Sequence, residues 1–133
     1  MLPPRGILET TLYVDDLGAA ERFYSEVFGL SAISRAPGRS VALRCHHDVL
    51  LLFDARRASE QTIEVDGAPI PRHGASGPGH VAFSLSKDEI PFWESRLQRL
   101  GVPIESRVHW PGGPESIYVR DPAGNKICAL RRG

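Results

Sequence analysis

The chain consists of two similar halves, and each half carries the same order of predicted elements. In the first half, a β-rich run over 7–14 precedes a helical period over 17–28, and Gly29 ends the helix. Three strand-like runs separated by turn residues follow, at 30–35, 41–45 and 49–54. The first half therefore predicts a strand, a helix and three further strands.

The second half repeats this order after a connector. Residues 55–78 contain two glycine and proline clusters and little periodicity, so they predict a surface connector. The helix that follows is opened by Ser86-Lys87-Asp88-Glu89 and stopped by Gly101. The strand-like runs of this half lie at 79–85, 102–108, 115–120 and 126–130. Internal repetition is the strongest constraint that this sequence places on the fold.

The repeat predicts an α+β fold made of two βαβββ modules. Module 1 spans about 7–54 and module 2 about 79–131, within a single domain over 1–133. Each module leaves one face of its mixed sheet uncovered, so we expect the modules to pack against each other or against a second chain and to form a strand-lined cup. Open sheet edges and a wide apolar cup also predict a homodimer.

Composition excludes several classes of protein. The 133 residues include 16 basic and 16 acidic side chains, so the net charge that attracts nucleic acid is absent. The longest apolar run covers 49–53, far below the roughly 20 residues that cross a bilayer, so no membrane partner is expected. The start of the chain has no secretory signal pattern, which predicts a cytoplasmic protein. Cys45 and Cys128 are expected to be free thiols.

Three motifs carry a resemblance to a known family. They are Leu12–Leu17 leading to Phe23-Tyr24 and Phe28–Leu30, then Gly79–Phe83, then Tyr118–Asn125. On these motifs and their order, the chain resembles the vicinal oxygen chelate superfamily, which groups glyoxalases, bleomycin-resistance proteins, extradiol dioxygenases and fosfomycin-resistance thiol transferases. The resemblance covers nearly the whole chain, from Ile7 to Leu130.

The resemblance implies a metal site. In the metal enzymes of the superfamily, the ligands come from the first and last strands of each module, and the first-strand positions match Glu9 and His80. The last-strand position, normally glutamate, is Cys128 here, and its counterpart in the first module falls near Leu51. A thiolate suits zinc or another softer ion better than Mg²⁺ or Mn²⁺. Nickel is also less expected.

Three alternatives remain open for this site. They are a Glu9, His80 and Cys128 site for zinc or another softer ion, a weak two-ligand site, and a metal-free cup that holds an organic ligand. Histidine and cysteine are also ordinary core residues. A carboxylate among apolar neighbours is costly to bury without a partner, so Glu9 is the predicted catalytic residue. A salt bridge from Glu9 to Arg44 is its structural alternative.

Substrate-binding residues are predicted from strand alternation and from the resemblance. Ser116 and Tyr118 share one face of their strand, and they match a Ser-x-Tyr pair that contacts substrate in fosfomycin-resistance relatives. Trp110 is expected either to cap the pocket or to fill the core. Arg44 completes the predicted substrate-binding set. Adjacent residues on a strand point to opposite faces, so His46-His47 is interpreted as a solvated turn.

Two functions follow as hypotheses. The first is a metal-dependent enzyme that acts on a small oxygenated molecule by a lyase, isomerase or thiol-transfer reaction. Ring cleavage is less expected, because iron dioxygenases use two histidines and a carboxylate, and only His80 stands at a matched position. The second is a metal-free protein of the bleomycin-resistance type that sequesters a small molecule without chemistry.

Overall fold

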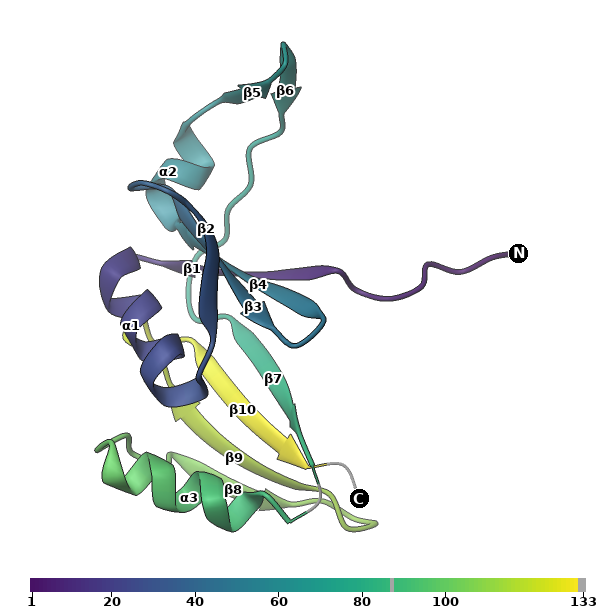
Figure 1. The fold of residues 1–133 in the computed structure, drawn as a ribbon, viewed down its shortest axis with the longest axis vertical. Coiled ribbons are helices and arrows are strands. Elements are labelled where there is room, and N and C mark those ends of the chain that lie inside the picture. Colours follow the sequence, from purple (N-terminus) through teal and green to yellow (C-terminus); the bar gives the residue numbers. More distant parts are fainter. Residues whose placement is uncertain (87, 132–133) are drawn as a thin grey trace. The chain divides into compact units, whose positions relative to one another are not determined.

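The computed structural model describes residues 1–86 and 88–131. The chain divides into two compact units, Met1–Gly77 and Pro78–Gly133. Each unit contains a four-stranded sheet, and Figure 1 labels the helices and strands along the chain. None of the helices in the described ranges is long and apolar enough to span a membrane.

The first unit has the predicted β-α-β-β-β order. Its elements are β1 (Glu9–Val14), α1 (Leu17–Phe28), β2 (Ser31–Ala36), β3 (Ser40–Cys45) and β4 (Asp48–Asp54). The sheet order is β1-β4-β3-β2, with β1 parallel to β4 and the other pairs antiparallel. At the start of α1, the Asp16 carboxylate accepts the backbone N–H of Ala19 at 3.0 Å. At its end, Gly29 adopts a left-handed conformation with φ of 70°.

Burial alternates along β1 and β4, and this alternation separates the two faces of the first sheet. Leu12 and Val14 of β1 are buried together with Leu50 and Leu52 of β4. Helix α1 lies against β3 and β4, and its own Ala20, Tyr24 and Val27 are buried. The opposite face of β1 carries Glu9, Thr11 and Tyr13. We call the sheet face turned away from α1 the first site face.

The second unit repeats the arrangement. Its elements are β7 (His80–Leu85), α3 (Ile90–Arg99), β8 (Ser106–His109), β9 (Glu115–Arg120) and β10 (Lys126–Arg131). The sheet order is β7-β10-β9-β8, and β7 is parallel to β10. The α+β fold of two βαβββ modules is therefore confirmed.

The second sheet also has two distinct faces. Alternate buried residues Ile117, Val119, Ile127 and Ala129 lie on the face toward α3, as does Arg107, whose guanidinium pairs with Glu94 of that helix at 3.0 Å. The residues between them in β7, β9 and β10 point away from α3. We call that face the second site face.

The connector is more structured than predicted. It contains α2 (Ala55–Glu60), capped by the Asp54 carboxylate, and a hairpin of β5 (Ile63–Val65) and β6 (Ala68–Ile70). The hairpin turns at Asp66-Gly67, where both residues have positive φ, 51° and 80°. An Asp-Gly pair between two short β-rich runs is a strong hairpin signal, and it accounts for the turn between β5 and β6.

Two predicted boundaries also differ from the structure. The strand expected over 102–108 begins only at Ser106, and the part that is not strand contains Pro103, which has no backbone N–H to donate. In the predicted opening segment of the second helix, the backbone N–H of Ser86 donates to the Glu89 carboxylate at 2.6 Å. Lys87 of that segment lies outside the described residues.

Candidate functional site

Four predicted site residues share the second site face. His80 begins β7, Cys128 lies on β10, and Ser116 and Tyr118 lie on β9. Cys128 is paired in register with Tyr118 on one side and with Ala82 on the other. Side chains directly opposite each other on neighbouring strands lie about 5 Å apart at Cβ. The fold of the second unit therefore brings the Cys128 and Tyr118 side chains together.

The His80 ring is oriented by the backbone of the neighbouring strand. Its Nδ1 lies 3.0 Å from the carbonyl oxygen of Lys126, and the side chain is exposed. A carbonyl oxygen can only accept, so Nδ1 carries the hydrogen and Nε2 of the neutral ring keeps its lone pair. Histidine ligands of metals are commonly held by such a hydrogen bond from the other ring nitrogen.

Two predicted substrate-binding residues contact each other. The indole N–H of Trp110 donates to Oγ of Ser116 at 2.8 Å. Ser116 is buried, whereas Trp110 is 45 % exposed, so the indole does not fill the core of its unit. The turn that carries Trp110 is closed by its backbone N–H, which donates to the Pro114 carbonyl at 2.8 Å. Trp110 thus lies beside Ser116 at the second site face.

Lys126 lies on the second site face and was not predicted from the sequence. It lies two residues before Cys128 on β10, so both side chains point to the second site face. Its ammonium nitrogen lies 5.4 Å from the centre of the Tyr118 ring, within range of a cation–π contact. Strand alternation counted back from Cys128 could have found it. Lys126 gives this face a positive charge next to His80, its register partner.

Arg120 also belongs to the second site face, but its charge is already paired. Its guanidinium Nε donates to the Glu105 carboxylate at 2.6 Å, and a second nitrogen donates to the same group at 3.2 Å. This hydrogen-bonded pair holds the pKa of Glu105 below its usual range. Lys126 differs from Arg120 in the kind of contact it makes: Arg120 is hydrogen-bonded to Glu105, whereas Lys126 acts on the same carboxylate only through its charge.

The two units carry different residues at the position of Cys128, as predicted. In the second unit, His80 pairs with Lys126, and Cys128 lies two residues after Lys126. In the first unit, Glu9 pairs with Val49, and the residue two positions after Val49 is Leu51. Leu51 is therefore the counterpart of Cys128. Leu51 has no metal-binding atom. Cys128 is a buried free thiol.

Glu9 lies on the first site face, but the argument from burial was wrong. Glu9 is exposed, and its neighbours Ile7 and Leu8 are 78 % and 74 % exposed. The expected alternative, a salt bridge to Arg44, is not formed within the described ranges, because Val49 of β4 lies between them in the sheet. Arg44 is exposed on the same face.

The structure does not test the three-ligand prediction. Glu9 belongs to the first unit, whereas His80 and Cys128 belong to the second. Over residues 1–86 and 88–131, no group of three or more His, Cys, Asp or Glu side chains is placed to hold a metal ion. The set of Glu9, His80 and Cys128 therefore remains a prediction.

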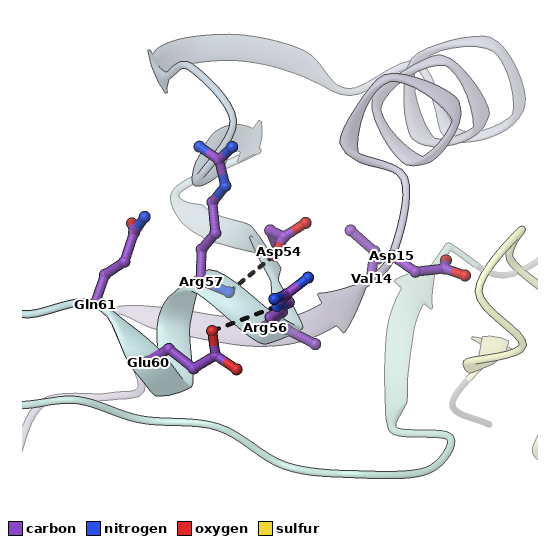
Figure 2. Close-up of a pocket in the computed structure, with 8 residues that line it drawn as sticks. Val14, Asp15, Asp54, Arg56, Arg57, Glu60 and Gln61 are labelled. Carbon is purple, nitrogen blue, oxygen red and sulfur yellow. Dashed lines mark hydrogen bonds and ion pairs between the residues drawn. The ribbon is translucent and has the colours of Figure 1, made fainter.

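One pocket of the first unit contains none of the predicted residues. It measures about 610 Å³ and is lined by Val14 and Asp15 at the end of β1 and by residues 54–57, Glu60 and Gln61 around α2. Figure 2 shows two contacts among the lining residues. The backbone N–H of Arg57 donates to the Asp54 carboxylate at 2.9 Å, and the Arg56 side chain pairs with Glu60 at 3.4 Å. We assign no ligand to this pocket.

Comparison with known proteins decides the family. The model of the Glyoxalase/Bleomycin resistance protein/Dioxygenase superfamily matches residues 6–129. The chain belongs to this superfamily. Metallothiol transferase FosB of Bacillus licheniformis is 29% identical over 123 residues, which cover 92% of this chain and 72% of that protein.

Two solved structures support the same assignment. A structure described as lactoylglutathione lyase from Agrobacterium tumefaciens is 44% identical, has a TM-score of 0.90, and is matched over 98% of this chain and 96% of that one. A glyoxalase/bleomycin resistance protein/dioxygenase from Nocardioides is 26% identical with a TM-score of 0.74, over 98% and 85% of the two chains. This chain is thus similar to one superfamily member described as a lyase and to another described as a thiol transferase.

The motif at 121–125, which carried part of the superfamily resemblance, has a structural role. Oδ1 of Asp121 accepts the backbone N–H groups of Ala123 and Asn125 at 3.0 and 2.8 Å. Oδ2 of Asp121 accepts the Asn125 amide at 3.0 Å, and both residues are buried. The motif builds the turn between β9 and β10, which sets the register that places Tyr118 beside Cys128.

Proposed function

We propose that this superfamily member is an enzyme that acts on a small oxygenated molecule with a divalent metal ion held by Glu9, His80 and Cys128. The observation that carries the proposal is the His80 ring, whose Nδ1 is held by a backbone carbonyl while Nε2 remains available on the second site face. The 44% identity to a protein described as lactoylglutathione lyase supports the same class of reaction. The reaction is a lyase or isomerase step or a thiol transfer.

The donor atoms fit a softer ion. An imidazole nitrogen, a thiolate and a carboxylate together suit zinc, whereas Mg²⁺ and Mn²⁺ prefer oxygen ligands and nickel is less favoured. When bound, such an ion polarises a carbonyl or stabilises an alkoxide oxygen. Cys128 must lose its proton to serve as a ligand, so the affinity for metal should fall at low pH. Glu9 is exposed, and its carboxylate forms no side-chain hydrogen bond or ion pair within the described ranges, so it is available to bind or to accept a proton.

Side chains of the second site face would bind the substrate. Tyr118 and Ser116 offer hydroxyl groups, and Trp110 lies beside Ser116. The Lys126 ammonium adds a positive charge that stabilises negative charge on a bound oxygen. Arg44 would contribute a second, exposed cation from the first site face.

We further propose that the protein is a homodimer. Short β-α-β-β-β modules leave sheet edges that need cover, and β1 to β4 and β7 to β10 form separate sheets. Light scattering at micromolar concentration tests this proposal, and a monomer would contradict it. If modules pair across chains, mixing Glu9→Ala with His80→Ala protein should restore about one intact site in each heterodimer.

Elemental analysis of protein purified without chelator or metal-affinity resin tests the function. We expect near-stoichiometric zinc, or another softer ion, in the native protein and a large loss in His80→Ala and Cys128→Ala. His47→Ala is a matched control, because His47 is an exposed turn histidine. Protein that is metal-free and cannot be loaded would overturn the enzyme proposal and favour a binding protein of the bleomycin-resistance type.

Replacing the thiol by the usual superfamily ligand gives a second test. Cys128→Glu should raise the affinity for Mn²⁺ in a calorimetric titration, because it restores an oxygen-rich ligand set. If Cys128 only packs as an apolar residue, the new carboxylate is buried without a partner, and stability falls by several kcal/mol. A large loss of melting temperature that Mn²⁺ does not reverse would therefore contradict the three-ligand site.

A further inference from the structure

A second cavity of the first unit lies between α2 and the segment that follows the hairpin. Its volume is about 520 Å³, and it is lined by Ala55 and Ser59 of α2 and by residues 72–76. All of these residues belong to the first unit, and none of them is an aspartate or a glutamate. This cavity, which we call the connector pocket, shares no residue with the proposed metal site and has no carboxylate on its walls.

Two contacts hold the segment 72–76 against α2. The backbone N–H of His73 donates to the Ala58 carbonyl of α2 at 3.3 Å. Gly74 lies so close to the helix that a Cβ added to it would be 3.1 Å from the Cβ of Ser59, which is tighter than ordinary van der Waals contact. The wall of the connector pocket is therefore held in place, although most of its side chains are exposed.

The His73 ring is fixed on one side and lines the pocket. Its Nδ1 lies 2.6 Å from Oη of Tyr13, and the ring meets Phe53 edge-on with centroids 4.4 Å apart. Tyr13 and Phe53 are register partners on β1 and β4, so the imidazole lies against two neighbouring strands. Because Nδ1 is engaged, Nε2 is the ring nitrogen left for a ligand. With a hydrogen on Nε2, the ring donates to an anion.

Arg72 brings a positive charge to the pocket. Its Nε and Nη2 donate to Oγ1 of Thr62 at 3.2 and 3.0 Å, so a neutral hydroxyl orients the guanidinium. A guanidinium has five N–H donors, and these two bonds leave three of them. In residues 1–86 and 88–131, Arg72 takes part in no ion pair. Glu60, which follows Ser59 in α2, is paired with Arg56.

The other wall residues add further donors. The backbone N–H groups of residues 74–76 form no backbone hydrogen bond in the part of the chain that the structure describes, and the Ser76 side chain is exposed. The Ser59 hydroxyl is different, because it donates to the Arg56 carbonyl at 3.0 Å and can only accept from a ligand. Donors that come from a guanidinium, an imidazole, a hydroxyl and the main chain suit a phosphate group, whose tetrahedral oxygens accept from several directions.

We propose that the connector pocket binds the phosphate group of a small phosphorylated molecule, with Arg72 and His73 as the principal contacts. Its volume lies within the range of roughly 300–1,000 Å³ that is typical of small-molecule sites. Inorganic phosphate would fill only part of it, and the organic part of the ligand would lie beside Ala55 and Ala75. Binding in this pocket needs no metal ion, so it is additional to the proposed function.

The test is a nuclear magnetic resonance titration of protein labelled in its backbone amides and in its histidine and arginine side chains. The probe is inorganic phosphate, and chloride keeps the ionic strength constant. We expect saturable shifts of the His73 ring, of the Arg72 Nε–H and of the amides of residues 74–76. Glycerol phosphate should bind at least as tightly as inorganic phosphate, whereas acetate should bind about tenfold more weakly.

Two variants of the pocket should each weaken the affinity for phosphate about tenfold, the effect of one lost charge-assisted hydrogen bond. They are Arg72→Gln, at an exposed position, and His73→Phe, which keeps an aromatic ring against Phe53. Arg99→Gln is the matched control, because it removes an exposed arginine from α3 in the other unit and should leave the affinity unchanged. The backbone amide spectrum of each variant shows whether it is folded.

Shifts that grow with phosphate concentration without saturating, or equal affinity in the parent and in Arg72→Gln, would mean an adventitious ion only and would overturn the proposal. Acetate that binds as tightly as phosphate would overturn the choice of a phosphate group. Protein treated with a chelator should give the same titration as untreated protein. Loss of the shifts after that treatment would place the phosphate on a metal ion and would also overturn the proposal.

Discussion

Oδ1 of Asn125 accepts the backbone N–H of Gly79 at 2.6 Å, and this bond ties the turn between β9 and β10 to the start of β7. The Lys126 N–H donates to the Gly79 carbonyl at 2.9 Å directly beside it. Together they set the parallel register in which His80 lies opposite Lys126. One buried amide therefore organises the strand ends that carry the candidate ligands of the second unit.

Asn125→Ala should reduce the free energy of unfolding by about 2 kcal/mol, because it leaves the Gly79 N–H and the Asp121 carboxylate without this partner in a buried turn. Denaturant unfolding followed by circular dichroism measures the change. Exposed Gln98→Ala on α3 is the control and should be nearly neutral. Equal stability of the two variants would contradict the role given to Asn125.

Gly29→Ala should destabilise the protein by about 1 kcal/mol, because the left-handed backbone at the end of α1 is strained for any residue with a Cβ. No atom lies within 4 Å of the Cβ that would be added, so the cost is one of conformation alone. Gly6→Ala is the matched control, since it also has open space and has no positive φ. Thermal unfolding of both variants checks the difference.

The Cys45 thiol should react slowly with iodoacetamide at neutral pH. Burial raises its pKa, and the nearby Asp48 carboxylate raises it further, so the thiolate fraction is small. Peptide mapping by mass spectrometry should show alkylation several times slower than that of a small free thiol. Asp48→Asn should accelerate it, and an unchanged rate in that variant would contradict the electrostatic part of the explanation.

Acid should weaken the contact between α1 and β2. The Arg35 guanidinium hydrogen-bonds to the Glu21 carboxylate and holds the pKa of Glu21 below its usual range. A carboxyl group whose pKa is lower in the folded state stabilises the protein above its unfolded pKa of about 4.3, and this contribution is lost as the pH falls through the folded value. Glu21→Gln should therefore lose fewer degrees of melting temperature than the parent between pH 6 and pH 3. The pair is partly exposed, so the difference should be a few degrees at most.

Local signals were sufficient for most of the fold. Gly29 and Gly101, which were predicted to end the two helices, both have positive φ at the observed helix ends. The predicted alternation along 115–120 corresponds to the two faces of β9. These features depend on backbone conformation and on side-chain period, both of which are encoded within a few residues. The two four-stranded sheets follow from repeating them.

The candidate site was predicted less completely, for physical reasons. Strand alternation could place Ser116 and Tyr118 on one face, but the contact of Trp110 with Ser116 depends on how a turn folds back. The hydrogen bond between Tyr13 Oη and His73 Nδ1 joins residues 60 positions apart, and His73 lies in an irregular segment, so no sequence periodicity predicts this contact. Exposure of Glu9 also escaped prediction, since apolar neighbours in sequence are not necessarily neighbours in a core.

The connector has a consequence for how relatives of this protein can diverge. Between residues 61 and 77, only Ile63 and His73 are partly buried, and all other side chains are exposed. Insertions, deletions and substitutions there cost little folding free energy, because they leave the apolar layer beneath α1 intact. A segment that tolerates change while supplying His73 to the sheet offers evolution, or a protein engineer, a place to exchange a loop without redesigning either sheet.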